Sequence, residues 1–223
     1  LKGSLPLAYL SIDVNDDFKL FEAKHSQNLL LYKILMETFY STNQLVREDS
    51  FLSIYNDMAS TYGSGAELLD FIYNLMPNED ELTYNHCLNS ALLAGMFANW
   101  VNMSEEETRT LIIACFYYDI GKSKLPYDVL WKPGKLTDEE FALVKKHPQI
   151  GYDSVFFTPL AEKYKNAILM HHERMDGSGY PNRLKGNAIH PLARYIAIID
   201  TYIAMASPRS YRSAMTPLKI LGH

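Results

Sequence analysis

The strongest chemical signal in the sequence is a pair of adjacent histidines. His171 and His172 are followed by Glu173 and then by a glycine-containing stretch over 175–187. A single histidine is usually a surface residue or a satisfied core residue, whereas two at the end of a helix, entering such a loop, favour a metal or catalytic site. Because successive helical residues point about 100° apart, both imidazoles reach one cluster only where the helix frays or where two metals are bound.

Two aspartates lie in segments that are otherwise apolar and are predicted to be helical. Asp119 ends the run ACFYYD and precedes Lys122 by three residues, and Asp200 lies within YIAIIDTYIAMA. A buried carboxylate without a partner costs free energy, so each of them needs a cation or a hydrogen-bond donor. Asp119 is therefore either paired with Lys122 or a metal ligand beside a lysine that binds phosphate, and Asp200 is expected to be ligated or paired.

Two further histidines complete a candidate set. His86 lies on an apolar helix face and taken alone reads as a core residue, and His147 directly precedes Pro148 at a helix end. Imidazoles mixed with carboxylates suit iron, manganese or zinc, and their wide spacing requires several helices to converge on one cluster. The candidate metal ligands are His86, Asp119, His147, His171, His172 and Asp200.

The elements that must position these residues are predicted to be helices, so the fold class is all-α. Ser104 with Glu107 and Thr137 with Glu140 form capping-box patterns, which mark helix starts. Before the first helix, the sequence indicates a short strand or a packed arm and then a turn at 15–17. Helices are expected over 25–44, 48–62, 66–75, 78–101, 104–119, 137–146, 160–172 and 193–206, and from Thr216 onward.

A soft boundary at Pro77 divides the chain into two parts. Residues 1–76 are interpreted as a mostly helical N-terminal extension or small regulatory domain, and 77–223 as the domain that carries the chemistry. A homodimer contact or a regulatory partner, if there is one, is expected to use residues 1–76.

Composition restricts the partners. The 223 residues carry a formal net charge of −5, which excludes the broad positive field of a general DNA or RNA binder but leaves room for a local phosphate site. Cys87 and Cys115 have no CxxC spacing and are interpreted as buried free thiols. Apolar runs stay well below the ~18 residues of a membrane span, and the chain shows no leader pattern at its start, so a cytoplasmic location without a membrane segment is expected.

Four stretches of the sequence, in this order, resemble the HD-GYP family, a branch of the HD phosphohydrolase superfamily. They are DIGKSKLP (119–126), KPGKLTDEEFALVKKHPQIGYD (132–153), HHERMDGSGYP (171–181) and, more loosely, ARYIAIIDTYIAMASPRSYRSAMTP (193–217). The resemblance covers about residues 80–220. It implies an HD-type helical bundle and a metal-dependent phosphodiesterase that opens cyclic di-GMP with metal-activated water.

The resemblance also implies roles for single residues. The candidate ligands match the family's metal ligands, with Asp119 bridging two divalent metal ions, iron or manganese. Lys122 matches the lysine near the scissile phosphate, so Asp119 and Lys122 are the expected catalytic residues. The expected substrate-binding residues are Lys122, Gly179, Tyr180, Pro181, Arg209 and Arg212.

The sequence departs from the family pattern at the residue that gives the family its name. Tyr118 stands where the His-Asp pair has its histidine. A neutral phenol, with a pKa near 10, ligates metals poorly, although a ferric centre can hold a tyrosinate. A weakened first metal site is therefore expected, with a single metal bound if that site stays empty. Leu82 and Ile203 replace acidic residues of some members, and Leu82 argues against a third metal.

Three functions are compatible with this pattern. The first is an active cyclic di-GMP phosphodiesterase with a weakened first metal site. The second is a catalytically degenerate member that binds cyclic di-GMP or a protein partner without turnover. The third is an HD-type phosphohydrolase for another nucleotide. The GYP loop, which contains Gly179, Tyr180 and Pro181, argues against the third function. The loss of so few ligands favours the first function over the second.

Overall fold

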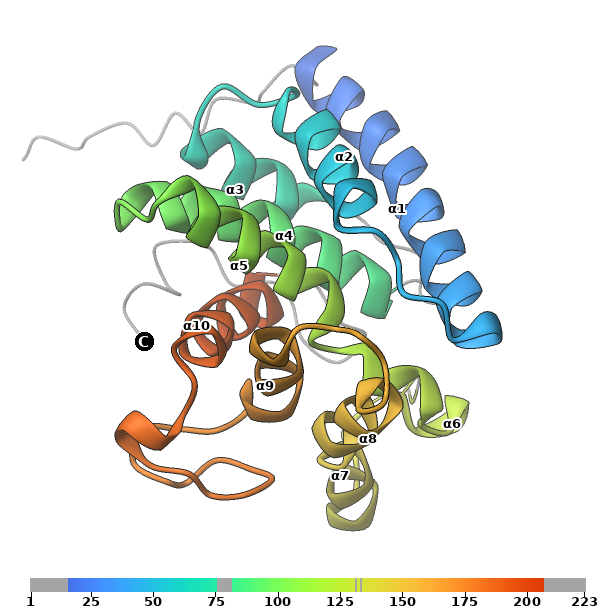
Figure 1. Cartoon of the computed structure of the whole chain (residues 1–223). Helices are drawn as coiled ribbons and strands as arrows, with labels where there is room; N and C mark the ends of the chain where they lie inside the picture. The colour runs from blue at the N-terminus through green and yellow to red at the C-terminus, as the bar shows by residue number, and fades with distance from the viewer. Residues whose placement is uncertain (1–15, 76–81, 131, 133, 207–223) are drawn as a thin grey trace, which may run out of the picture.

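The computed structural model describes residues 16–75, 82–130, 132 and 134–206, and all the regular structure in these ranges is helical (Figure 1). The predicted all-α bundle is confirmed. No helix among the described residues is long and apolar enough to cross a membrane. The helices are α1 (Asp16–Thr42), α2 (Glu48–Ala59), α3 (Gly65–Asn74), α4 (Leu82–Trp100), α5 (Glu105–Tyr117), α6 (Tyr127–Leu130), α7 (Asp138–Val144), α8 (His147–Val155), α9 (Glu162–Met170) and α10 (Pro191–Ala206), with 3-10 turns η2 (Ile120–Lys124) and η3 (Gly186–Ala188).

The first helix begins earlier than expected. Asp16 and Asp17, predicted to lie in a turn, form the first turn of α1, where negative side chains are favoured by the helix dipole. The helix runs for 27 residues and so extends well before His25, where the sequence placed its start. The predicted strand or arm, the first residues of the helix predicted over 78–101 and the helix from Thr216 lie outside the described residues.

Helices α4 and α5 form the centre of the bundle. Most of α4 is buried on all its faces, as expected for a helix surrounded by others. The capping box predicted at the start of α5 is present, because Glu107 N–H donates to Ser104 Oγ at 3.3 Å and Ser104 N–H donates to Glu107 Oε2 at 2.9 Å. This cap fixes where α5 starts, and its other end, Tyr117, leads directly into Tyr118 and Asp119.

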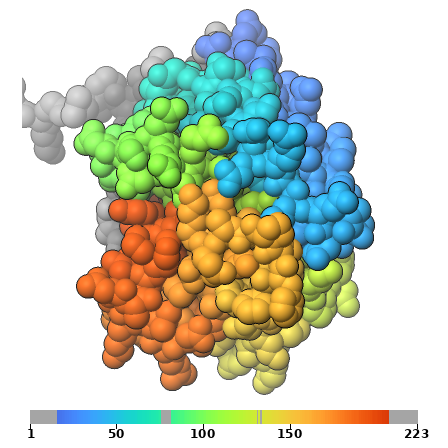
Figure 2. All heavy atoms as spheres, in the orientation of Figure 1, coloured from blue at the N-terminus to red at the C-terminus, as the bar shows by residue number. Residues whose placement is uncertain are grey.

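The N-terminal helices share a hydrophobic core with the central pair. The Phe51 ring of α2 stacks on the Phe116 ring of α5 with centroids 4.8 Å apart, and the Tyr32 hydroxyl of α1 donates to the Phe116 carbonyl. In the space-filling view these helices, blue to cyan, lie directly against the later ones (Figure 2). Cys87 and Cys115 are buried in the same core as free thiols. A domain boundary at residue 76 stays a prediction.

The stretch after α7 was predicted incompletely. Thr137 caps α7 through Glu140, as the sequence indicated, but α7 ends at Val144. A second helix, α8, then begins at His147, with Pro148 in its first turn, where proline is tolerated because the N–H it lacks would have no helical partner. His147 therefore begins a helix instead of following the end of one.

A close backbone contact sets the position of α8. A Cβ atom on Gly121, in η2, would lie 2.0 Å from the His147 carbonyl oxygen and 2.6 Å from the Gly151 nitrogen. Only glycine permits this approach, and the approach fixes the start of α8 against the turn that follows Asp119.

Replacing Gly121 by alanine is expected to push α8 away from η2, since backbone atoms cannot give way as a flexible side chain would. We expect a loss of about 3 kcal/mol in the free energy of unfolding, which lowers the melting temperature by about 6–12 °C. Gly63→Ala is the control, because the nearest atom to its Cβ is Glu67 Oε2 at 3.4 Å. Equal melting temperatures for the two variants, measured by circular dichroism, would contradict the prediction.

Candidate metal centre

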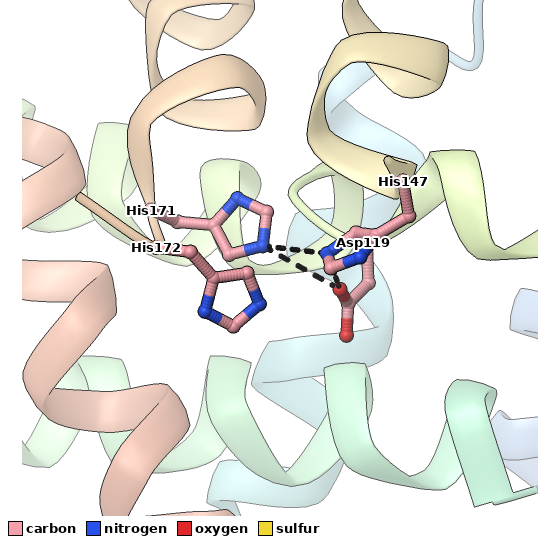
Figure 3. A group of neighbouring side chains, drawn as sticks. All are labelled: Asp119, His147, His171 and His172. Atoms are coloured by element: carbon pink, nitrogen blue, oxygen red, sulfur yellow. Dashed lines mark hydrogen bonds and ion pairs between the residues drawn. The ribbon is translucent and has the colours of Figure 1, made fainter. Parts of the chain in front are cut away.

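Side chains from five separate parts of the chain converge beside the end of α5. Figure 3 shows His171 and His172 leaving the end of α9, and His147 at the start of α8 with Asp119 next to it, facing His171. The structure also brings in His86 from α4 and Asp200 from α10. All the predicted metal ligands therefore lie in two groups that share Asp119. The groups are Asp119, His147, His171 and His172, and His86, Asp119 and Asp200.

The proton positions on two histidines are fixed by the backbone. His147 Nδ1 lies 2.7 Å from the Val144 carbonyl oxygen, and His171 Nδ1 lies 2.8 Å from the Ile168 carbonyl oxygen. A carbonyl only accepts hydrogen bonds, so each Nδ1 carries a proton and donates it. In the neutral form of each ring, Nε2 is then left with a lone pair.

These lone pairs face one another and a carboxylate. His147 Nε2 lies 3.0 Å from His171 Nε2, and the two nitrogens lie 3.2 Å and 3.6 Å from Asp119 Oδ1. Asp119 Oδ1 is buried and has no hydrogen-bond partner among the described residues. Three acceptors at these distances repel one another unless a cation lies between them. The backbone carbonyls that orient the rings are the outer partners typical of metal-bound histidines. The residues present therefore fit a metal ion.

The second group is held by a direct contact. His86 Nε2 lies 2.8 Å from Asp200 Oδ1, and His172 Nδ1 lies 3.8 Å from Asp200 Oδ2. Asp200 thus lies near a histidine of each group. The adjacent histidines reach one centre because α9 ends at Met170, which leaves His171 as the cap and His172 beyond the helix. This is the frayed-end geometry that the sequence allowed.

Lys122 completes the charge balance of the site. Burial alone would raise the pKa of Asp119, but the Lys122 ammonium beside it holds that pKa well below its usual value. Lys122 Nζ donates to Asp119 Oδ2 at 2.6 Å. Burial would lower the pKa of Lys122, and Asp119 outweighs it, so the pKa is raised. Burial also lowers the pKa of His147 and of His172, which favours the neutral, ligating form of both rings.

Tyr118 lies inside the cluster but is not aimed at it as a ligand. Its side chain is fully buried, and its hydroxyl lies 3.1 Å from Ser90 Oγ. Burial and the nearby carboxylates of Asp119 and Asp200 raise its pKa well above the usual value, so it is a neutral phenol. The ring contacts the His171 ring edge-on, with centroids 5.0 Å apart. Tyr118 therefore fills the space beside the second group with an aromatic ring.

The GYP loop lies against the centre. The Tyr180 ring stacks on the His172 ring with centroids 4.7 Å apart, and Pro181 follows it. A Cβ on Gly179 would lie 2.4 Å from the His172 carbonyl oxygen, so only glycine lets the loop approach this closely. The other two predicted substrate-binding residues, Arg209 and Arg212, lie outside the described residues.

Glu173 is a site residue to which the sequence reasoning gave no role. Its side chain is 2 % exposed, and its two carboxylate oxygens accept hydrogen bonds from Asn182 N–H at 2.7 Å and Leu184 N–H at 2.9 Å. These bonds tie the far side of the GYP loop back to the end of α9. The signal in the sequence is its position directly after the two histidines, where an acidic side chain needs a partner if it is buried.

Replacing Glu173 by alanine is expected to release the GYP loop, because two backbone N–H groups lose the charged, buried acceptor that holds them. We expect a loss of about 3 kcal/mol in stability and faster tryptic cleavage at Arg183 and Lys185. Asp176→Ala is the control, since Asp176 accepts only from Ser178 within the exposed part of the loop. Cleavage rates that are equal for both variants would show that Glu173 does not hold the loop.

A helical bundle with a shared histidine–aspartate centre at the junction of its helices is the architecture of the HD-type proteins. Residues 70–221 match the HD domain family, which is more than half of the chain, and the chain belongs to that family. The predicted likeness to the HD-GYP branch is confirmed, and HD-domain phosphohydrolases are metal-dependent.

Curated relatives agree with this family. The "Cyclic di-GMP phosphodiesterase response regulator RpfG" of Xanthomonas campestris is 43% identical over 126 residues. The match covers 56% of this chain and 33% of that protein. The "Cyclic di-GMP phosphodiesterase" of Thermotoga maritima is 36% identical over 66% of the chain and 40% of its own length. The "3'3'-cGAMP-specific phosphodiesterase 2" of Vibrio cholerae is 32% identical over 74% of the chain and 32% of its own length. The chain thus spans between about a third and two fifths of the length of these proteins.

One solved structure supports the fold over nearly the whole chain. "Bd1817, a HDG"Y"P protein from Bdellovibrio bacteriovorus" superposes with a TM-score of 0.71, covering 95% of this chain and 68% of that one, at 18% identity. At this identity the likeness shows the fold alone. It includes the N-terminal helices, which the family match from residue 70 does not.

Proposed function

We propose that this chain is a metal-dependent phosphodiesterase that hydrolyses cyclic di-GMP. The observation that carries the proposal is the shared Asp119, which joins two groups of imidazoles and carboxylates while Lys122 donates to its other oxygen. Relatives named as cyclic di-GMP phosphodiesterases supply the substrate class. Two iron or manganese ions are the proposed metals, because mixed imidazole and carboxylate ligands suit both.

Each of the chain's own site residues is expected to have a separate role in the reaction. Bound divalent ions would polarise the phosphodiester and lower the pKa of a water molecule. Asp119, with its pKa held low, supplies negative charge to both groups. Lys122 is 19% exposed, so its ammonium can reach a phosphoryl oxygen from its place beside Asp119. Tyr180, stacked on His172, forms a wall next to the site, and Glu173 keeps that wall in place.

Turnover is favoured over binding without turnover. A metal centre that has lost its activity usually lacks several ligands. This chain retains six candidate ligands in two groups, and Lys122 lies beside the Asp119 carboxylate. The ring of Tyr118, the residue that differs, lies 5.0 Å from the His171 ring and 6.1 Å from the His86 ring, so it borders both groups. Its effect is expected on the group of His86 and Asp200, because the family resemblance assigns the missing histidine to that group.

The test is turnover by protein purified without oxygen, with Fe(II) and Mn(II) supplied separately and cyclic di-GMP and 3'3'-cGAMP as substrates. Metal-dependent formation of a linear dinucleotide or mononucleotide from cyclic di-GMP, seen by liquid chromatography, is the expected result. Hydrolysis of 3'3'-cGAMP alone would show that 3'3'-cGAMP, and not cyclic di-GMP, is the substrate. Nucleotide binding without product, with either metal, would show that the chain is a binding protein and not an enzyme.

Restoring the histidine of the His-Asp pair tests the weakened site directly. Tyr118→His is expected to raise the metal content per chain and the turnover rate, because an imidazole at this position offers a nitrogen where the phenol offers none. Tyr118→Phe is the matched control, since it removes only the hydroxyl that contacts Ser90. Metal analysis by mass spectrometry reports the content, and equal content in both variants would show that Tyr118 is not the weak point.

A cytoplasmic location, and a homodimer contact or regulatory partner through residues 1–76, stay predictions.

A further inference from the structure

A small pocket opens beside the metal centre and shares Lys122 with it. It has a volume of about 220 Å³ and is lined by α1, the start of α4, η2 and α6. Binding sites for whole drug-sized ligands usually measure about 300–1,000 Å³, so this pocket suits one ring system and not an entire dinucleotide. Its lining residues are Tyr40, Thr83, Tyr84, Lys122, Ser123, Leu125, Tyr127 and Leu130.

The pocket shares a residue with the candidate metal centre. Lys122 forms part of its wall, and the ammonium of the same side chain donates to Asp119 Oδ2 at 2.6 Å. A phosphate held between Lys122 and the metal ligands would therefore have the pocket next to it. The base, which is joined to that phosphate through the sugar, is the part of the nucleotide that can enter the pocket.

The other walls are mainly aromatic and apolar. Tyr40, Tyr84 and Tyr127 come from three different helices, and Leu125 is a buried residue of the same lining. Tyr127 is 61% exposed, so its ring is accessible to a ligand from solution. Flat aromatic walls favour a flat ring, and stacking of a base on an aromatic side chain strengthens nucleic-acid binding by about tenfold or more per base.

Polar groups at the rim complement this surface. The Lys124 ammonium lies 5.9 Å from the centre of the Tyr40 ring, and the hydroxyls of Thr83 and Ser123 belong to the lining. The Lys122 ammonium is paired with Asp119, and Lys124 supplies a second ammonium beside the pocket. Burial raises the pKa of Tyr84 to about 12, so its hydroxyl stays a hydrogen-bond donor at neutral pH.

We infer that this pocket binds one nucleobase of the nucleotide whose phosphate lies at the metal centre, with Tyr40 and Tyr127 as its stacking residues. The inference rests on the proposed function for the phosphate and adds where the base goes. Tyr40 lies outside the HD domain match of residues 70–221. The N-terminal helix α1 therefore contributes directly to substrate binding, in addition to packing on the bundle.

The test compares two ligands that differ only in the base. GMP and ribose 5-phosphate share the sugar and the phosphate, so the ratio of their dissociation constants, measured by isothermal titration calorimetry with Mn(II)-loaded protein, isolates the base. The native chain is expected to bind GMP at least about tenfold more tightly. Tyr127→Ala and Tyr40→Leu are expected to lose most of that preference, while the affinity for ribose 5-phosphate and the metal content stay native.

Tyr195→Ala is the matched control, because Tyr195 is a 37% exposed tyrosine of α10 that lines a different pocket. Loss of the GMP preference in either tyrosine variant, with the control unchanged, supports the inference. If Tyr40→Leu does not fold, Tyr127→Ala decides alone, since it alters an exposed side chain. A native ratio in every folded variant, or equal binding of the two ligands by the native chain, overturns the inference.

This experiment separates the pocket from the enzyme activity. Native protein that hydrolyses cyclic di-GMP but binds GMP and ribose 5-phosphate equally would overturn the base site and keep the proposed function. Base-dependent binding that is lost in the tyrosine variants, without turnover, would support the base site and overturn the proposed function.

Discussion

Replacing Asp119 by asparagine is expected to strip metal from both groups of the centre and to lower turnover of cyclic di-GMP by about a thousandfold or more. Asp119 is the residue common to the two groups, so its loss weakens both at once. The new amide would carry no charge. Its NH2 group would also donate to the Nε2 lone pairs of His147 and His171, which lie 3.2 Å and 3.6 Å from Asp119 Oδ1. The acceptors that attract a metal ion would then be satisfied without one.

The measurement is metal content together with thermal unfolding, since both are independent of activity. Adding Mn(II) is expected to raise the melting temperature of the native chain, because a ligand that binds only the folded state stabilises it, and to leave that of the variant unchanged. His171→Ala should act in the same direction, and Asp153→Asn, an exposed aspartate on α8, should behave as native. Native metal content in the Asp119 variant would rule out the proposed centre.

Lys122→Met is expected to lower turnover by about 10²–10³-fold with metal still bound, which is the usual cost of removing one group that stabilises charge in a transition state. Methionine keeps most of the apolar stem of lysine and removes the ammonium. In the native chain this ammonium donates to Asp119 Oδ2, and the lysine is part-exposed and lines the adjoining pocket. Asp119 Oδ1, which faces the two histidines, is not the oxygen that Lys122 contacts.

The loss should fall on the catalytic rate and not on metal content, which separates Lys122 from the ligands. Without the ammonium, the pKa of Asp119 should rise, so the variant is expected to need a higher pH to bind metal fully. Lys19→Met, at an exposed position of α1, is the control. Should the variant lose metal at every pH in proportion to activity, Lys122 would be a structural partner of Asp119 and not a group that acts on substrate.

Much of the candidate site was accessible from residue types and order. The adjacent pair His171 and His172, Asp119 in apolar text, and the four family-like stretches predicted an all-α bundle with a metal centre. Local signals placed the starts of α5 and α7, because a capping box is a contact between residues three apart in the sequence. Such features depend on neighbours in the chain, so the chain alone determines them.

Other features depend on contacts between distant segments. The start of α8 at His147 depends on Gly121, which lies 26 residues earlier and lets two backbones meet. The role of Glu173 appears only when the loop returns and offers the N–H groups of Asn182 and Leu184. These pairings are set by packing, and no periodicity within one segment encodes them.

The residue types and their order specify which chemistry the chain can carry: imidazoles and carboxylates for a metal, a lysine for a phosphate, and helices to hold them. How these groups meet depends on the packing of the helices. It aimed the lone pairs of His147 and His171 at one oxygen of Asp119. It also brought Tyr40 of the N-terminal helix beside Lys122. The physical reason is that side-chain type is a local property, whereas the direction of a lone pair and the walls of a pocket are fixed by helices packing across long sequence separations.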